Sequence, residues 1–315
     1  MQKPKRFALC FAILTAVFTV YLLLDTFVIE RDYSLSNAST AATAVSDSET
    51  TAARASTLSS TLSAPETVLA LPADAEKIGS AVTDSYEIDL YTFRVNNTQI
   101  YAADLKLSSV QELKTAFAEG RAGRNITDTT SAIAAQSGAV LAINGDFYGA
   151  REKGIVIRNG VLYRDSASDE EILVIYADGS FEILSGTEKS GEELLADGAW
   201  QAFSFGPGLV EDGAVSVSAA DEVGRAKSSN PRTAVGTLGE GHYLFLVSDG
   251  RTEESEGLSL YELSSLLHEM GCVQAYNLDG GGSSTMVFRG MLVNRPTTNG
   301  KRITERSVSD IVYIG

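Results

Sequence analysis

The chain has little of several residue types that define common protein classes. Its 315 residues include two cysteines, two histidines and one tryptophan. Cys10 lies in an apolar N-terminal run and Cys272 lies far away in the globular region, so we expect no disulfide between them. The domain must therefore be stable through its own core, which a chain of this length can supply. Because His242 and His268 are the only histidines, a multi-histidine metal site is excluded.

Positive charge is also scarce. The chain has 25 Lys and Arg residues against 41 Asp and Glu residues, and its formal net charge is -16. An acidic surface repels phosphate polymers, so we expect no nucleic-acid partner. A small anionic group can still bind in a local basic pocket. Hydrophobic residues at 44% and charged residues at 21% are ordinary for a globular protein.

The N-terminus predicts a membrane anchor. Residues 1–6 form a basic tail with Lys3, Lys5 and Arg6, and residues 7–24 form an unbroken apolar run. Roughly 18 apolar residues just suffice to cross a bilayer. Basic residues before the run predict a cytoplasmic N-terminus and an extracellular remainder. The alternative is a cleaved signal peptide, but no small-x-small site closely follows the run, which favours an uncleaved anchor.

Residues 25–75 are predicted to form a stalk, and residues 76–315 a single folded domain. From Tyr33 to about Pro72, Ser, Thr and Ala dominate and aromatic residues vanish after Tyr33. Such a segment cannot bury enough apolar surface to offset the entropy lost on ordering. Residues 86–90 and 91–95 then alternate in opposite phases, which predicts one strand with a bulge or bend. Hairpin turns are predicted at residues 96–97, 159–160, 178–179 and 239–241.

Three helices are predicted in the domain. A capping box of Ser109 and Glu112 predicts a short helix that presents residues 110, 113 and 117 on one side. A second helix is expected near residues 128–136 and ends at Gly138. A third begins at the capping box of residues 259 and 262 and ends at Gly271. The expected fold class is α+β, a single mixed-sheet domain with many hairpins and a few helices, preceded by one transmembrane helix.

Four segments place polar residues at the ends of apolar strands, where binding sites usually lie. Each segment also has a structural interpretation, because Asp and Asn favour turns and satisfy backbone groups, and an arginine can be a surface ion-pair residue. Three consecutive glycines are costly in chain entropy, but their amides can form an anion-binding concavity. The candidates are Asn144, Asp146, Arg232, Thr233, Asp249, Asp279, Gly280, Gly281, Gly282 and Ser283.

Together these residues suit a carbohydrate that carries a negatively charged substituent. There is no Gly-x-Ser-x-Gly elbow, no phosphate-binding P-loop and no His-Glu-x-x-His helix. With these segments in view, residues 80–315 resemble the phosphodiester glycosidase family, whose bacterial members include exported proteins linked to exopolysaccharide. The matching motifs are Asn144-Gly-Asp-Phe-Tyr, Phe205-Gly-Pro-Gly-Leu, Asn230-Pro-Arg-Thr-Ala-Val-Gly, Ser248-Asp-Gly-Arg, Gly257-Leu-Ser-Leu-x-Glu-Leu, Asn277-Leu-Asp-Gly-Gly-Gly-Ser-Ser-Thr and Arg306-Ser-Val-Ser-Asp.

The resemblance implies a hydrolase in which water attacks the anomeric carbon of a sugar-1-phosphodiester in cell-surface or exopolysaccharide glycan. The predicted membrane topology places this hydrolase outside the cytoplasm. Arg232 is expected to hold the phosphate, because a guanidinium matches phosphate oxygens bidentately. Asp279 or Asp249 is expected to act as nucleophile or base, and the sequence does not order the two. Asn144 and Asp146 are expected to bind sugar hydroxyl groups, and Thr233 and Ser283 are weaker candidates for substrate binding. The backbone amides of Gly280, Gly281 and Gly282 are expected to assist Arg232 at the phosphate.

Two other functions stay open at this point. The domain could bind a cell-wall glycan without cleaving it. It could also bind Ca²⁺ and mainly support structure or adhesion. The calcium ligands would then be Asp146, Asp249, Asp279 and Asp310. No cofactor is expected to be required, although Ca²⁺ is possible.

Overall fold

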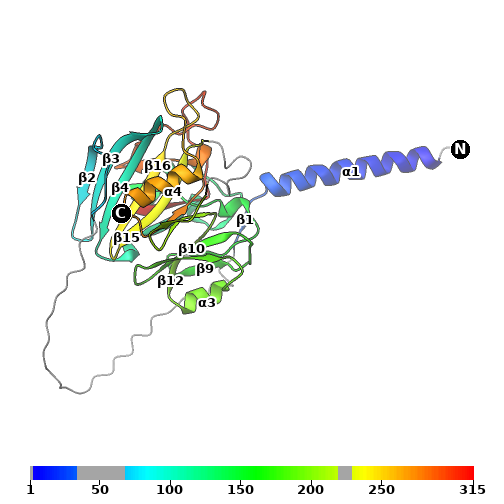
Figure 1. The fold of residues 1–315 in the computed structure, drawn as a ribbon. Coiled ribbons are helices and arrows are strands. Elements are labelled where there is room, and N and C mark those ends of the chain that lie inside the picture. The colour runs from blue at the N-terminus through cyan, green and yellow to red at the C-terminus, as the bar shows by residue number, and fades with distance from the viewer. Residues whose placement is uncertain (1–2, 34–67, 219–228) are drawn as a thin grey trace, which may run out of the picture.

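The computed structural model describes residues 3–33, 68–218 and 229–315. The apolar N-terminal run lies in helix α1 (Lys3–Phe27), which projects away from the rest of the molecule (Figure 1). In these described ranges, no helix is both long and apolar enough to cross a membrane. The predicted transmembrane anchor is therefore not supported.

Sheets make up most of the domain, and their described strand pairs are antiparallel. The eight-stranded sheet has the order β14-β13-β17-β15-β16-β4-β3-β2. In that order its strands are Ala214–Val215, Gly208–Glu211, Gln274–Asn277, Arg232–Gly239, His242–Ser248, Thr98–Leu107, Tyr86–Val95 and Glu76–Val82.

Two five-stranded sheets and one strand pair complete the β-structure. The order β19-β18-β7-β20-β5 comprises Met291–Leu292, Met286–Phe288, Leu141–Asn144, Asp310–Ile314 and Lys114–Phe117. The order β11-β10-β12-β8-β9 comprises Phe181–Ser185, Glu171–Tyr176, Ala199–Ser204, Val156–Arg158 and Val161–Arg164. Strand β1 (Arg31–Asp32) pairs with β6 (Gly123–Arg124).

Few helices accompany the sheets, so the predicted α+β class is confirmed. Helix α2 (Thr130–Ser137) ends at Gly138 in the left-handed conformation, as predicted. Helix α4 (Leu260–Glu269) begins at the predicted capping box, in which Ser259 and Glu262 cap each other. Helix α3 (Gly191–Ala196) was not predicted. Single turns of 3-10 helix lie at Val110–Glu112, Ala118–Gly120, Tyr148–Ala150 and Gly281–Ser283.

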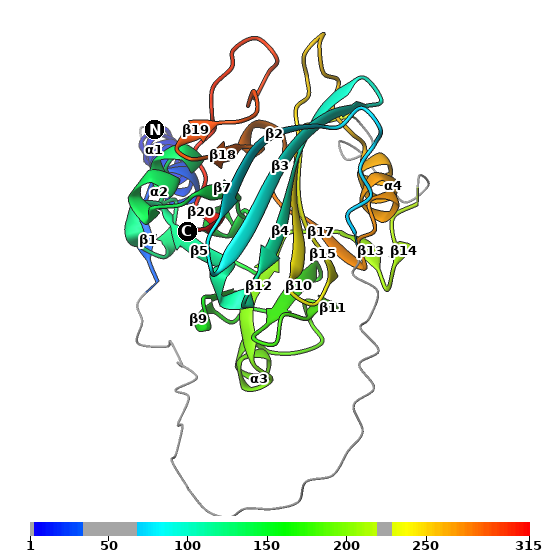
Figure 2. The same cartoon turned by 90° about the vertical axis from the view of Figure 1, so that its left-hand side faces the viewer.

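The eight-stranded sheet has an apolar core on each face. One core lies between this sheet and the two five-stranded sheets and includes Phe245, Leu173 and Val312. The other lies under α4 and includes Leu246 and Leu263. Figure 2 shows α4 against the large sheet, with the β7–β20 sheet on its other side. This sandwich places the ends of β7, β15 and β17 close together.

Two local predictions are corrected by this packing. Only one helical turn follows Ser109, and the predicted helix is wrong because residues 114–117 form β5 and pair with β20. A distant partner strand thus outweighs a local capping signal. Strand β3 pairs regularly with β4 throughout, so the phase change reflects burial of Ile88 and Leu90 in one core and Phe93 in the other. The irregularity lies in β2, between Lys77 and Gly79.

The described ends of the predicted stalk both contact the domain. Strand β1 pairs with β6, and the backbone N–H of Tyr33 donates to the carbonyl oxygen of Ala122 at 2.9 Å. Leu69 is buried in the core beneath α4. Residues 34–67, most of the predicted stalk, lie outside the described residues, and the domain boundaries stay predictions.

Candidate active site

Asn144 joins the three strand ends at the centre of the candidate site. It is the last residue of β7 and is fully buried. Its Nδ2 donates to the carbonyl oxygen of Asp279 at 2.6 Å, just beyond the end of β17. Its Oδ1 accepts from the Thr233 hydroxyl at 2.8 Å and from the Thr285 N–H at 3.2 Å. Asn144 therefore fixes both ends of the segment that holds the three glycines.

Glycine is required in that segment because other residues approach its backbone closely. Gly281 has a φ of 64°, and a Cβ there would lie 2.8 Å from Nη2 of Arg251. A Cβ on Gly282 would lie 2.4 Å from the Thr298 hydroxyl oxygen. The N–H of Gly281 donates to the carbonyl oxygen of Pro231 at 2.8 Å. The glycines thus let the loops that carry Arg251 and Thr298 close over the segment.

Asp279 and Arg306 form an ion pair at this segment. Nη2 of Arg306 lies 2.8 Å from Oδ2 of Asp279, and Nε donates to the Ser283 hydroxyl at 2.8 Å. The Asp279 side chain is 11% exposed and the Arg306 side chain 38%. Within the described ranges no hydrogen bond reaches Nη1 of Arg306. The hydrogen-bonded carboxylate of Asp279 and the partly exposed guanidinium of Arg306 therefore lie side by side.

A buried charge cluster is centred on Arg158. Arg158 donates from Nη2 to Oδ1 of Asp146 and from Nε to Oδ2 of Asp310, both at 2.8 Å. All three side chains are at most 1% exposed, and the guanidinium stacks over Phe203 at 4.3 Å from the ring centre. The backbone N–H of Gly145 donates to the carbonyl oxygen of Asp310 at 3.0 Å. The cluster thus ties β8 and β20 to the turn after β7.

Asp310 carries an unusual carboxyl group. No described residue is a hydrogen-bond partner of its buried Oδ1. Burial raises the pKa of Asp310 to about 7, although the charge of Arg158 opposes the shift. The charges of Asp146 and, more weakly, Asp279 raise this pKa further. Between about pH 4 and pH 7 the folded protein therefore holds a proton on Asp310 that the unfolded chain has released.

This proton predicts a pH-dependent stability. Between about pH 4 and pH 7 the folded state binds more protons than the unfolded state, so the free energy of unfolding falls as pH rises. Asp310→Asn should remove this term. Relative to wild type, the variant should gain stability by at most about 1.4 kcal/mol per pH unit across that window. Urea unfolding of both proteins at several pH values checks this, and a constant difference between them would show that Asp310 is ionised throughout.

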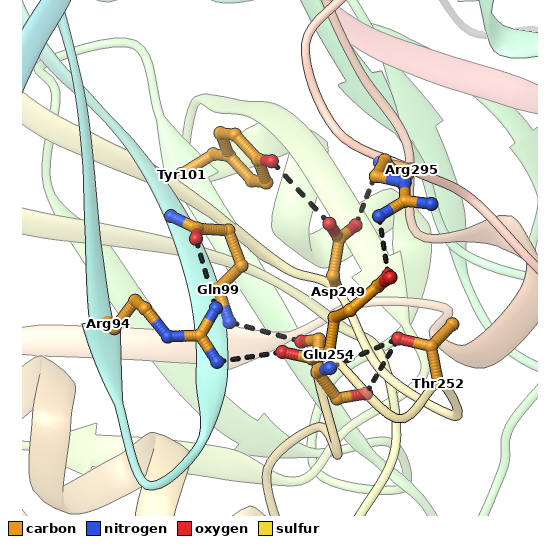
Figure 3. Close-up of a pocket in the computed structure, with 8 residues that line it drawn as sticks. Arg94, Gln99, Tyr101, Asp249, Thr252, Glu254 and Arg295 are labelled. Carbon is orange, nitrogen blue, oxygen red and sulfur yellow. Dashed lines mark hydrogen bonds and ion pairs between the residues drawn. The ribbon is translucent and has the colours of Figure 1, made fainter.

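Asp249 follows β16 and lies in a separate pocket, shown in Figure 3. Its Oδ1 accepts from Nδ2 of Asn294 at 3.1 Å and from the backbone N–H of Arg295 at 2.9 Å. The Tyr101 hydroxyl lies 3.5 Å from Oδ2. Burial raises the pKa of Asp249, and these hydrogen bonds oppose the shift. Burial, assisted by the charge of Asp249, raises the pKa of Tyr101 to about 12.

Arg232 begins β15 and points away from Thr233. Its Nε donates to the carbonyl oxygen of Leu258 at 2.8 Å, near the start of α4. Adjacent residues on a strand face opposite sides of the sheet. Thr233 contacts Asn144 on one face, so Arg232 lies on the face that α4 covers.

The structure therefore brings together part of the predicted site. Asn144, Thr233, Asp279, the glycines and Ser283 form one assembly. Asp146 adjoins it through Gly145, whose carbonyl oxygen accepts from the N–H of Asp279 at 3.3 Å. Asp249 and Arg232 have other partners. Sequence reasoning did not assign a role to Arg158, Arg251 or Arg306. The available signal was that Arg251 and Arg306 lie in the motifs Ser248-Asp-Gly-Arg and Arg306-Ser-Val-Ser-Asp.

The calcium ligand set is not assembled. In the described part of the chain, no three His, Cys, Asp or Glu residues are grouped to hold a metal ion. Asp146 and Asp310 share Arg158, Asp279 pairs with Arg306, and Asp249 lies in its own pocket. Cys272 is a free buried thiol, and burial raises its pKa to about 12.

The protein thus combines an α+β fold with a carboxylate–guanidinium pair on a glycine segment. Comparison with known proteins identifies its family. The family model described as phosphodiester glycosidase matches residues 137–315. The chain belongs to this family, which confirms the resemblance drawn from its motifs.

Individual relatives match over part of their length. The chain is 29% identical over 198 residues to the uncharacterized SPbeta prophage-derived protein YomE of Bacillus subtilis. The aligned region covers 61% of this chain and 30% of that protein. It is 31% identical over 144 residues to human N-acetylglucosamine-1-phosphodiester alpha-N-acetylglucosaminidase. This aligned region covers 44% of this chain and 25% of the enzyme. The matched part thus spans less than a third of these relatives.

A solved structure shares the fold. The zebrafish N-acetylglucosamine-1-phosphodiester alpha-N-acetylglucosaminidase catalytic domain, described as auto-inhibited by its pro-peptide, has a TM-score of 0.59 at 20% identity. The match covers 76% of this chain and 87% of that one. At this identity the likeness concerns the fold alone.

Proposed function

We propose that this protein hydrolyses a sugar-1-phosphodiester at the bond between the anomeric carbon and the phosphate oxygen. The observation that carries the proposal is the Asp279–Arg306 pair on the glycine segment. The mammalian relatives are named for removing N-acetylglucosamine from such a diester. Family membership and the pair's chemistry therefore support the same reaction class.

The chemistry requires one carboxylate and one cation. A phosphate monoester is a good leaving group, so it needs electrostatic stabilisation more than a proton. Arg306 lies beside Asp279, is partly exposed and presents a planar fork that matches phosphate oxygens. Asp279 attacks the anomeric carbon or activates water. Its ion pair with Arg306, at 2.8 Å between Nη2 and Oδ2, holds the carboxylate in place for either role.

The deeper residues position these two groups. Asn144 and Asp146 direct their side-chain atoms at protein partners and are at most 2% exposed. Asn144 holds the carbonyl oxygen of Asp279, while Asp146 binds Arg158. We assign Asn144 to positioning of the glycine segment and Asp146 to positioning of the turn after β7, rather than to direct contact with sugar hydroxyls.

Incubation of the full chain with a sugar-1-phosphodiester, with and without a chelator, tests the proposal. Release of the free sugar is expected, and activity that survives the chelator would separate catalysis from a calcium-dependent role. Absence of turnover on any such diester, with a folded protein that still binds glycan, would favour the non-catalytic glycan-binding function instead.

We also propose that the domain acts outside the cytoplasm on cell-surface or exopolysaccharide glycan. The support is the apolar run after Lys3, Lys5 and Arg6, with no comparable basic cluster immediately after it. The proposal concerns location and does not depend on a retained anchor. Protease added to intact cells should reach the domain, whereas protection until lysis would place it inside.

A further inference from the structure

The residues that line the pocket containing Asp249 do not include Asp279 or Arg306, the pair proposed above to cleave the bond. It has a volume of about 100 Å³. A cavity of about 10–15 Å³ already holds one water molecule, so the pocket has room for several hydroxyl-sized groups. The lining residues that matter here are Arg94, Gln99, Tyr101, Asp249, Glu254 and Arg295 (Figure 3).

The charges of this pocket compensate one another. Two arginines and two carboxylates, those of Asp249 and Glu254, line it. Nη1 of Arg295 lies 2.6 Å from the Glu254 carboxylate, and Nη2 of Arg94 donates to the Glu254 carbonyl oxygen at 2.7 Å. With no excess of either sign, neither an anion nor a cation is favoured. The chemistry fits a neutral polar ligand.

The pocket also offers hydrogen-bonding groups of the right kind. Asp249 is 5% exposed, and its Oδ1 already accepts two hydrogen bonds. In the described part of the chain, Oδ2 meets only the Tyr101 hydroxyl, at 3.5 Å, the outer limit of a hydrogen bond. An ionised carboxylate accepts up to about four hydrogen bonds. A ligand hydroxyl can therefore donate to Oδ2 and accept from Tyr101, while the tyrosine ring contacts its C–H groups.

The pocket lies next to the glycine segment. Nδ2 of Asn294 donates both to Oδ1 of Asp249 and to the carbonyl oxygen of Ser284 at 2.9 Å. Ser284 directly follows Ser283, which accepts the hydrogen bond from Arg306. One asparagine thus connects the pocket to the end of the segment that carries the proposed reaction.

We propose that the Asp249 pocket is a subsite for a hydroxyl-bearing sugar residue of the substrate. Asp249 and Tyr101 bind the hydroxyl groups, so Asp249 acts in recognition rather than as nucleophile. This inference rests on the proposed function. The sugar is either the one released or one in the group attached to the other phosphate oxygen.

Two diesters of the same sugar-1-phosphate, one with a methyl group and one with a methyl hexoside on the phosphate, distinguish these sources. Asp249→Asn should raise KM by about 10- to 100-fold, the range for a lost hydrogen bond to a charged group, and Tyr101→Phe by less. An increase confined to the hexoside diester assigns the attached group to the pocket. An equal increase for both diesters assigns the released sugar.

Tyr91→Phe is the matched control. Tyr91 lies on the neighbouring strand β3, and its hydroxyl is 3.4 Å from Oδ2 of Asp89, outside the pocket. Thermal melting should show that all three variants remain folded. Unchanged KM in Asp249→Asn and Tyr101→Phe would overturn the proposal. A fall in kcat at constant KM for Asp249→Asn would also overturn it, by placing Asp249 in the reaction.

A direct binding measurement keeps this inference separate from the proposed reaction. If the wild type turned over neither diester, the proposed function would fail while the subsite could still be tested. Saturation-transfer NMR with free methyl glucoside and free N-acetylglucosamine should show binding to the wild type that is lost in Asp249→Asn. No transfer to either sugar in the wild type, or equal transfer in the variant, would remove the subsite.

Discussion

Asp279→Asn should lower kcat by about 10² to 10⁴-fold, the usual contribution of a catalytic base. The change keeps size and shape but removes the negative charge that a nucleophile or base requires. Nη2 of Arg306 can still donate to the Asn oxygen at the position where it meets Oδ2 of Asp279. The fold should therefore survive, and the loss should appear in turnover rather than in melting temperature.

The comparison of activity with stability in this variant decides the role of Asp279. If Asp279 only shapes the turn before the glycines, Asn should serve almost as well, because both residues favour turns. Near-normal turnover in Asp279→Asn, together with an inactive Asp249→Asn, would move the catalytic role to Asp249. A large drop in melting temperature with a proportionate loss of activity would make Asp279 structural.

Arg306→Lys should lower kcat by about 10² to 10³-fold, the usual cost of losing an electrostatic stabiliser. Lysine keeps the charge but loses the planar fork that reaches Ser283 and Asp279 together. It also lacks a second terminal nitrogen for the phosphate.

Arg232→Lys is the informative comparison, because Arg232 is the phosphate-binding residue that the sequence suggests. Its Nε meets the carbonyl oxygen of Leu258 on the face of β15 opposite Thr233. We expect a smaller loss of kcat than in Arg306→Lys, measured on one diester under the same conditions. A larger loss in Arg232→Lys would return the phosphate-binding role to Arg232.

Local patterns predicted the elements whose stabilising contacts are close in sequence. Helix α4 begins at its capping box because Ser259 and Glu262 are three residues apart, and Asn96 and Asn97 both adopt the positive φ of the turn between β3 and β4. Strand β5 was missed because its partner β20 lies almost two hundred residues further along the chain.

The same limit applies to the site. Asp279 and its glycines could be found because the strand, the acidic residue and the glycines follow one another in the sequence. The roles of Arg158 and Arg306 could not, because they depend on which residues the sheets bring together. Arg158 lies between Asp146 and Asp310, which come from different segments. Arg306 reaches Asp279 from a loop that follows β19.

Water labelled with a heavy oxygen isotope tests most directly whether the bond between the anomeric carbon and the phosphate oxygen is the one that is cleaved. The full chain is incubated with a sugar-1-phosphodiester in labelled water, and both products are examined by mass spectrometry soon after release. We expect the label in the hydroxyl group of the sugar and an unlabelled phosphate monoester. Label in the phosphate would show attack at phosphorus and contradict the proposed glycosidase reaction.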